Sequence, residues 1–341
     1  MSRIFVRGWG SVSPAGWGVE ALRHECAAGR PLPVKPLVRP GWERPLRGRV
    51  VPPPPSRPEP LSHARLRRSS PISQFAVSAA WEAMGGKHAP GATSAIGIVL
   101  CVMSGCVNYS RRFYDEVLKD PAVASPLVFP ETVFNAPSSH LAALLESTAI
   151  NYTLVGDPGT FLVGLALAAQ WLGEGLVDDC LVVGAEEHDW LTADAFRLFT
   201  REMVVCEGAG ALRLSREPGP LPVELAAVTD AQIFWDGSSR AAAAREVARQ
   251  LAATGNSQWL CDSRQGVRRC DEAEAAAWKD WKGTCVSPKT ILGEGLMAAA
   301  AWQCVLAADA VGREVTPEAW VSVVGCNEQA VGGVFRGTGH E

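Results

Sequence analysis

The sequence of 341 residues lacks the features that mark several broad classes of protein. Its net charge of −4 leaves no excess of basic residues for binding nucleic acid. Its apolar runs are too short, or too often interrupted by charge, to span a bilayer. The N-terminus lacks the apolar segment of a secretory signal and is typical of a strand at 4–8. We therefore expect a cytoplasmic protein with neither a nucleic-acid nor a membrane partner.

Motifs for binding metals, phosphates and dinucleotides are also missing. The ten cysteines form no CxxC pair, and most lie in apolar segments, where a free cysteine behaves as a small hydrophobic residue. This usage is typical of a reducing compartment rather than of a disulfide framework. The sequence therefore predicts neither a metal site nor a bound cofactor.

Segments typical of strands and helices alternate along the chain. Strands are predicted at 4–8, 95–102, 151–155, 179–185, 208–215, 226–228, 258–261 and 320–325. Helices are predicted at 18–28, 70–84, 110–118, 138–147, 160–172, 238–254, 271–282 and 293–309. This alternation predicts an α/β fold with parallel sheets between helical layers.

Two weakly similar halves, 1–215 and 216–341, suggest an internal duplication. The Pro/Arg-rich stretch 31–60 has no apolar period, so we interpret it as an extended surface excursion. The paired acids at 178–179 and 186–187 flank a predicted strand in the manner of turn residues.

The turn at 155–160 has an unusual tip. It joins the strand 151–155, which we expect to be buried, to an apolar helix. Such a turn can hold a nucleophile at a helix N-terminus, where the pKa of a thiol is lowered. Pro158 stands there instead and offers neither a lone pair nor a proton. We favour a structural interpretation, in which Asp157 caps the helix and Pro158 occupies its first turn, over a catalytic role for Asp157.

Four segments occur in an order that is typical of one protein family. They are VRGWGSVSPAG at 6–16, FPETVFN at 129–135 followed by His140, LVVGAE at 181–186 and EGAGAL at 207–212. On these segments, the chain resembles the β-ketoacyl-acyl carrier protein synthases over nearly its whole length. The resemblance implies the thiolase fold, with duplicated βαβαβαββ halves in α-β-α-β-α layers, and a dimer-forming insertion at 104–145.

At each active position of that family, this sequence has a different residue. Counted without gaps from Asn135, the position of the acyl-accepting cysteine falls on Pro158. The two active histidines fall on Ser263 and Glu294, although Lys289 before the second is retained. The Gly-rich loop that shapes the acyl and pantetheine entrance becomes VGCNEQ at 324–329.

Claisen condensation needs a thiolate and two imidazoles or their equivalents. The histidines of this chain lie outside the loops in question: His24, His63, His88, His140, His188 and His340. We therefore expect no autonomous condensing activity and no catalytic residues of this kind. We expect Lys289 and Glu294 to fill the former site as an ion pair.

The resemblance implies a degenerate subunit of the chain-length-factor type. Such subunits pair with an active ketosynthase in bacterial type II polyketide and aryl-polyene systems and set product length. The implied partners are a ketosynthase and an acyl carrier protein, whose phosphopantetheine would be the only prosthetic group. The implied interface covers 127–141 and 150–155. The candidate tunnel and interface residues are Phe129, Val133, Phe134, Leu141 and Val155.

Two other functions stay open at this point. One is acyl transfer or hydrolysis that uses Asp262, Ser263, Glu294 or Cys326. The other is a homodimeric scaffold that binds an acyl carrier protein without chemistry. The basic run 65–68 would attract an acidic carrier protein, although a solvated charge run is the more frequent explanation.

Overall fold

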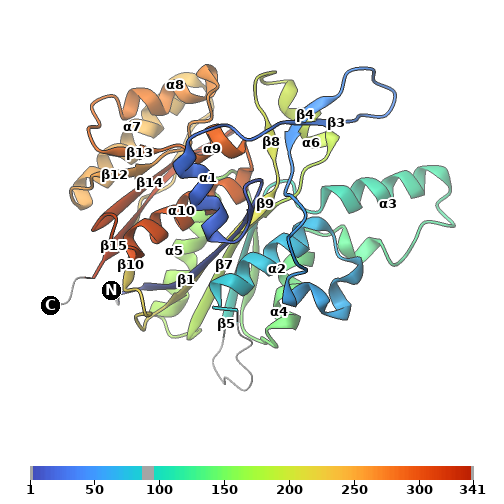
Figure 1. The fold of residues 1–341 in the computed structure, drawn as a ribbon, viewed down its shortest axis with the longest axis horizontal. Helices are drawn as coiled ribbons and strands as arrows, with labels where there is room; N and C mark the ends of the chain where they lie inside the picture. The colour runs from blue at the N-terminus through green and yellow to red at the C-terminus, as the bar shows by residue number, and fades with distance from the viewer. Residues whose placement is uncertain (1–2, 87–95, 339–341) are drawn as a thin grey trace.

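The computed structural model describes residues 3–86 and 96–338 (Figure 1). His88 and His340 lie outside the described residues, as does Ala95, with which the second strand was predicted to begin. No helix within these two ranges is both long and apolar enough to cross a membrane.

Each half of the chain forms five main strands in the same arrangement. In the first half they are β1 (Phe5–Ser13), β5 (Ile96–Val102), β6 (Asn151–Val155), β7 (Asp179–Glu186) and β9 (Gly208–Ser215). In the second they are β10 (Val223–Val228), β12 (Trp259–Cys261), β13 (Thr284–Val286), β14 (Glu318–Val324) and β15 (Gln329–Gly337).

When the five strands of a half are numbered in chain order, they lie side by side in the sheet in the order third, second, fourth, fifth, first. In both halves the second strand is parallel to its two neighbours, whereas the fifth is antiparallel to the fourth and first. Antiparallel pairing of β1 with β10, at Phe5 with Glu224 and Val6 with Val223, joins the halves edge to edge. The repeated order is the topology expected of a duplication.

The helices form three layers around these sheets (Figure 1). Helices α2 (Pro71–Ala83) and α4 (Ala136–Leu144) cover the outer face of the first half. Helices α7 (Gly237–Thr254) and α8 (Arg268–Ala277) cover that of the second. Between them, α5 (Thr160–Gly173) and α10 (Leu296–Gly312) contact strands of both halves. The layered α/β fold expected from the sequence is confirmed.

The apolar central helix α10 shows why the sequence forms these layers. Its residues are buried on every side from Leu296 to Val311. A helix that is apolar all round is stable only when it is covered all round. Its buried acid, Asp309, forms an ion pair with Arg23 of α1 (Val19–Ala28) at 2.9 Å.

The remaining elements are short and lie mainly at the periphery. They are β2 (Gly16–Trp17), β11 (Gln232–Ile233), α3 (Val107–Lys119), α6 (Trp190–Arg197), α9 (Pro288–Leu292) and the 3-10 helices η1 (Glu59–Ser62), η2 (Ala64–Arg68) and η3 (Phe129–Glu131). Helix α3 projects from the body as an arm (Figure 1).

The excursion 31–60 is more ordered than the sequence predicted. It contains a hairpin of β3 (Lys35–Leu37) and β4 (Leu46–Arg49), and β4 pairs in parallel with β8 (Val205–Cys206). Strands of three and four residues are too short to show an apolar alternation. The stretch is mainly exposed, as expected of a surface excursion, but it also holds this short hairpin, which the sequence did not predict.

Strand β6 was correctly located, but the expectation that it is buried is wrong. Asn151, Tyr152 and Val155 are exposed, and none of the five residues is buried. The reason is that β6 is the last strand of the sheet and pairs, among the described strands, with β5 alone. Its other edge leaves backbone groups free for a further strand.

Candidate functional site

The turn between β6 and α5 carries Pro158, at the position of the missing nucleophile. Pro158 is buried, and α5 begins two residues later, with Gly159 as its N-cap residue. None of the described side chains caps α5; instead the main-chain oxygen of Asp157 accepts the N–H of Thr160 at 2.7 Å. The prediction that the Asp157 side chain caps this helix was therefore wrong. Its carboxylate turns toward a loop that offers more donors.

That loop is the turn between β14 and β15, and its main-chain N–H groups surround the Asp157 carboxylate. Oδ1 accepts the N–H groups of Cys326 at 3.2 Å and Asn327 at 3.0 Å. Oδ2 accepts those of Glu328 and Gln329, both at 3.2 Å. The thiol of Cys326 also donates to Oδ1 at 3.2 Å. Successive N–H groups that converge in this way form an anion site, and here an anion of the chain itself fills it.

Gly325 is what allows the carboxylate to approach so closely. A Cβ atom at this position would lie 1.7 Å from Oδ2 of Asp157. Convergent N–H groups are also the device that stabilises negative charge developing on a substrate oxygen. Because Asp157 occupies these donors, the oxygen of an acyl group cannot use them.

Ser263, at the position of the first active histidine, is also bonded internally. It follows β12, and its hydroxyl donates to Oε2 of Glu274 at 2.6 Å and accepts the N–H of Val324 at 2.9 Å. Glu274, on α8, accepts a second hydroxyl from Ser322 at 2.6 Å. Burial, and then the charge of Asp262, raises the pKa of Glu274 to about 7. This buried network joins β12, α8 and β14.

Glu294, at the position of the second histidine, pairs with Lys289 as expected. Nζ of Lys289 lies 2.8 Å from Oε2 of Glu294, and both side chains are buried. The other carboxylate oxygen accepts the N–H of Leu296 at 2.8 Å, at the start of α10. Burial alone would lower the pKa of Lys289, but the charge and hydrogen bond of Glu294 outweigh it and the pKa is raised. The lysine is therefore held as a cation with its own counter-ion.

Asp262 does not join Ser263 and Glu294 in a common reactive group. Its carboxylate accepts the hydroxyl of Ser287 at 2.6 Å and the thiol of Cys285 at 3.2 Å, and it pairs with Arg264. Asp262, Ser263 and Glu294, which the alternative of acyl transfer or hydrolysis would use, thus belong to three separate bonded groups.

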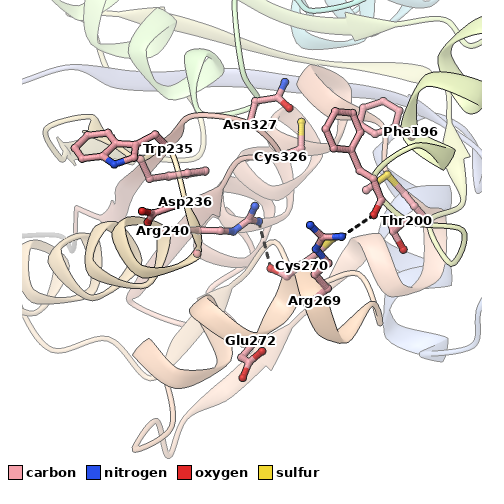
Figure 2. A pocket seen from close by; sticks show the side chains of 14 residues that line it. Phe196, Thr200, Trp235, Asp236, Arg240, Arg269, Cys270, Glu272, Cys326 and Asn327 are labelled. Atoms are coloured by element: carbon pink, nitrogen blue, oxygen red, sulfur yellow. Dashed lines mark hydrogen bonds between the residues drawn. The ribbon is translucent and has the colours of Figure 1, made fainter.

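A pocket of about 390 Å³ lies beside these groups (Figure 2). Cys326 and Asn327 stand at its back, with aromatic side chains and two arginines in front of them (Figure 2). Arg240 donates to the main-chain oxygen of Cys270 at 3.2 Å and lies 5.2 Å from the ring of Phe234. Neither Pro158 nor the residues of the two histidine positions lines this pocket.

The cysteines offer no activated thiol. Burial is the leading cause that raises the pKa of all ten, and it raises those of Cys26, Cys106 and Cys285 to about 12. For Cys326, burial is reinforced by the adjacent Asp157 carboxylate. A thiol rather than a thiolate is a poor nucleophile. Within residues 3–86 and 96–338, no cluster of three or more metal-ligating side chains is placed to hold a metal ion.

The candidate tunnel and interface residues fall into two groups. Phe129, Val133, Phe134 and Val155 are exposed, with exposed fractions from 39% to 56%. Leu141, on α4, is only 2% exposed and packs in the core beneath α2. The first four are therefore available to a partner subunit, whereas Leu141 packs within the chain.

The paired acids after β7 are not surface turn residues. Glu186 and Glu187 are both 1% exposed. Glu186 accepts the N–H groups of Met103 and Ser104, and Glu187 accepts those of Ile72 and Asn108. Burial is the main cause that raises their pKa values, to about 8 for Glu186 and about 7 for Glu187. These two side chains hold the segment that leads into α3.

Sequence reasoning missed several groups at this site. Glu274 was not among the predicted site residues, although an acid on the apolar side of a helix signals a buried partner. Arg240, Arg269 and Trp235 line the pocket, but no local motif distinguishes them. They come together only because the start of α7 and the start of α8 lie side by side.

Comparison with known proteins gives matches to structures alone. No family model matches the sequence, and no curated protein does so at a significant level. The structure of the ishigamide ketosynthase/chain length factor is 20% identical, with a TM-score of 0.80, over 99% of this chain and 100% of that one. A ketosynthase in complex with its chain length factor, from Xenorhabdus doucetiae, is 15% identical, with a TM-score of 0.80, over 99% and 98%.

A third structure, of a type II polyketide acyl-carrier protein in complex with its ketosynthase, is 14% identical. Its TM-score is 0.78, over 99% of both chains. Each of these matches covers 99% of this chain and therefore spans both halves. This chain therefore has the thiolase-like fold of the ketosynthases and chain length factors.

Proposed function

We propose that this chain is a non-catalytic subunit of the chain-length-factor type, which pairs with an active ketosynthase. One observation carries the proposal: each position where condensation needs a free reactive group holds a buried side chain, and the two polar ones are bonded internally. Pro158 is buried, Ser263 is bonded to Glu274, and Glu294 is paired with Lys289. The chain keeps the framework of a condensing enzyme, but its polar groups serve stability.

The exposed edge of β6 supports pairing with a second subunit of the same fold. Tyr152 and Val155 are 55% and 56% exposed on this edge. An exposed strand edge with apolar side chains is normally covered in the functional protein. A ketosynthase would present the equivalent edge, so the two sheets would continue across the interface. A homodimer through the same edge is the alternative.

In the proposed pair, Phe134 would form part of the wall of the shared tunnel. It is 45% exposed, and its ring packs on Gly105, where a Cβ atom would come within 2.4 Å. Because this contact restricts its position, the side chain would act as a fixed wall rather than as a flexible plug. The volume at the end of a closed tunnel limits how many methylene groups it can accept.

The proposed partners also include an acyl carrier protein, whose phosphopantetheine would bring the growing chain to the ketosynthase. This assignment rests on the shared fold and on the carrier-protein complex among the similar structures. The chain itself would hold no cofactor.

Co-expression with the ketosynthase tests the proposal. A stable one-to-one complex that makes product only when both subunits are present is the expected result. Val155→Lys should weaken the complex because it places a charge on the β6 edge. Val315→Lys is the matched control, since Val315 is 62% exposed in the loop after α10. A homodimer that ignores the ketosynthase, or turnover by the isolated chain, would refute the proposal.

A further inference from the structure

The segment 129–134 carries three of the side chains that the proposed pair would share. Phe129, Val133 and Phe134 are all exposed. The segment consists of η3 and the turn that leads into α4, and we call it the η3 segment. Exposed connecting segments are normally mobile, so one that forms a fixed wall must be held in place from behind.

Contacts with α3 hold the η3 segment on one side. The ring of Phe113 lies 5.4 Å from that of Phe129. The hydroxyl of Ser110 donates to the main-chain oxygen of Thr132 at 3.1 Å. None of the residues of α3 is buried, so these contacts join the segment to an element that is itself exposed. They do not fix it relative to the body of the protein.

A polar network on the other side ties the η3 segment to the body. The carboxylate oxygens of Glu131, in η3, lie 2.9 and 3.1 Å from Nε2 of His140 on α4. Nδ1 of His140 lies 3.2 Å from Nε of Arg65, in η2. Nη2 of Arg65 also donates to the hydroxyl of Ser139 at 3.2 Å. Because the side chain of His140 is buried, this link lies inside the protein.

The hydrogen bonds of this network have a defined direction. A guanidinium group only donates, so Nδ1 of His140 must accept the N–H of Arg65. The ring proton is then on Nε2, which donates to Glu131. The imidazole therefore joins a cation in one 3-10 helix to an anion in another. A side chain at position 140 that cannot donate would leave Glu131 without this bond.

The network also accounts for the first residue of the basic run 65–68. Arg65 directs its guanidinium to α4, where it binds His140 and Ser139. The next residue, Leu66, is buried in the core with residues of α2 and α4. The helix η2 is therefore a fixed support for His140.

We propose that His140 is a positioning residue: through Glu131 it fixes the η3 segment, and with it the wall that this chain contributes to the shared tunnel. This inference rests on the proposed function, which supplies the tunnel. It assigns control of product length to a buried histidine that acts through another residue. A side chain that merely filled the space at position 140 would not hold Glu131.

Variants that keep or remove the bond to Glu131 test the proposal. His140→Leu removes it, whereas His140→Gln keeps an N–H that can donate to Glu131. Glu131→Ala breaks the same bond from the less buried side, so it serves if His140→Leu does not fold. Leu144→Ala is the matched control, because Leu144 lies one turn further along α4 and is buried in the core without a polar partner. Each variant is co-expressed with the ketosynthase, and its products are measured by mass spectrometry.

We expect the ratio of the main product to the next in the series to fall about threefold or more in His140→Leu and Glu131→Ala. His140→Gln should restore most of the ratio. Leu144→Ala should lower the urea midpoint but leave the ratio unchanged. An unchanged ratio in both His140→Leu and Glu131→Ala, an equal fall in His140→Gln, or the same fall in Leu144→Ala would overturn the proposal.

Hydrogen–deuterium exchange of the isolated chain tests the positioning itself. The N–H groups of Glu131 and Thr132 donate to the main-chain oxygens of Val128 and Phe129, both at 3.0 Å. Exchange in a peptide covering 129–136 should be about tenfold faster in His140→Leu, as expected for the loss of one hydrogen bond, and close to wild type in His140→Gln. Unchanged exchange in His140→Leu would overturn the proposal.

Pairing separates this inference from the proposed function. Size-exclusion chromatography of each variant with the ketosynthase reports pairing, which we expect to persist because the β6 edge is intact. A wild-type chain that pairs, in a complex whose products ignore position 140, contradicts only the inference. A wild-type chain that fails to pair contradicts the proposed function.

Discussion

Asp157→Ala should destabilise the chain far more than the loss of a helix cap would. The carboxylate is 2% exposed and accepts four main-chain N–H groups and one thiol. The N–H of Gln329 is buried and would lose its only acceptor, which costs about 1–3 kcal/mol. The other three N–H groups belong to less buried residues and can recover water, so each would cost about 1 kcal/mol or less. The expected total is about 3–5 kcal/mol.

Urea unfolding, monitored by circular dichroism, measures this loss of stability. Two further variants test whether the anion site is its cause. Asp157→Asn keeps one acceptor oxygen and the side-chain volume, so it should lose about half as much. Asp236→Ala is the contrasting control, because Asp236 is an exposed N-cap residue that accepts the N–H of Ser239 at 2.7 Å. Loss of such a cap costs about 1 kcal/mol. If Asp157→Ala costs no more than Asp236→Ala, the anion-site interpretation is refuted.

Three further predictions concern Phe134, the Lys289–Glu294 pair and Glu186. Phe134→Ala in the reconstituted pair should give longer products by mass spectrometry, and unchanged product length would count against the tunnel role. Lys289→Met or Glu294→Gln alone should lower the free energy of unfolding in urea by about 3–5 kcal/mol, because one partner stays buried and unpaired. The double variant should recover much of this loss, and additive losses would contradict the pairing. Burial raises the pKa of Glu186 to about 8, above the ordinary value of 4.5, so its stabilising contribution is complete below about pH 4.5 and is lost as the pH rises through 8. The melting temperature of Glu186→Gln should therefore fall less between pH 5 and pH 8 than that of the wild type; equal slopes would show that Glu186 does not titrate in this range.

The layers of the fold could be predicted because their signals are local. The strand β7 and the helix α10 are long apolar runs, and each is buried throughout or nearly so. A run of this kind has few stable arrangements other than a central one. The β3–β4 hairpin escaped prediction because its strands are too short to show a period.

The arrangement of the site could be predicted only in part. The Lys289–Glu294 pair was predictable because the two residues are five positions apart, one in α9 and the other in the turn that follows it. The partners of Asp157 lie about 170 positions away, and no local pattern links them. The exposure of β6 was missed for a similar reason. An apolar strand has the same sequence whether its outer edge meets another strand of the chain or a separate subunit.

The repeated topology explains why several polar groups meet in one buried region. The turn after β6 and the loop after β13 both follow the third strand of a half, and both lead toward a central helix. The duplication therefore brings Asp157 and Glu294 into the same region, together with the β14–β15 turn. Polar groups gathered there must be satisfied whether or not catalysis occurs, because unpaired buried groups cost several kcal/mol in total. Asp157 and the Lys289–Glu294 pair meet that demand from within the chain. For this reason, a cysteine introduced at position 158 alone would lie beside donors that are already occupied, and we expect it to confer no condensing activity.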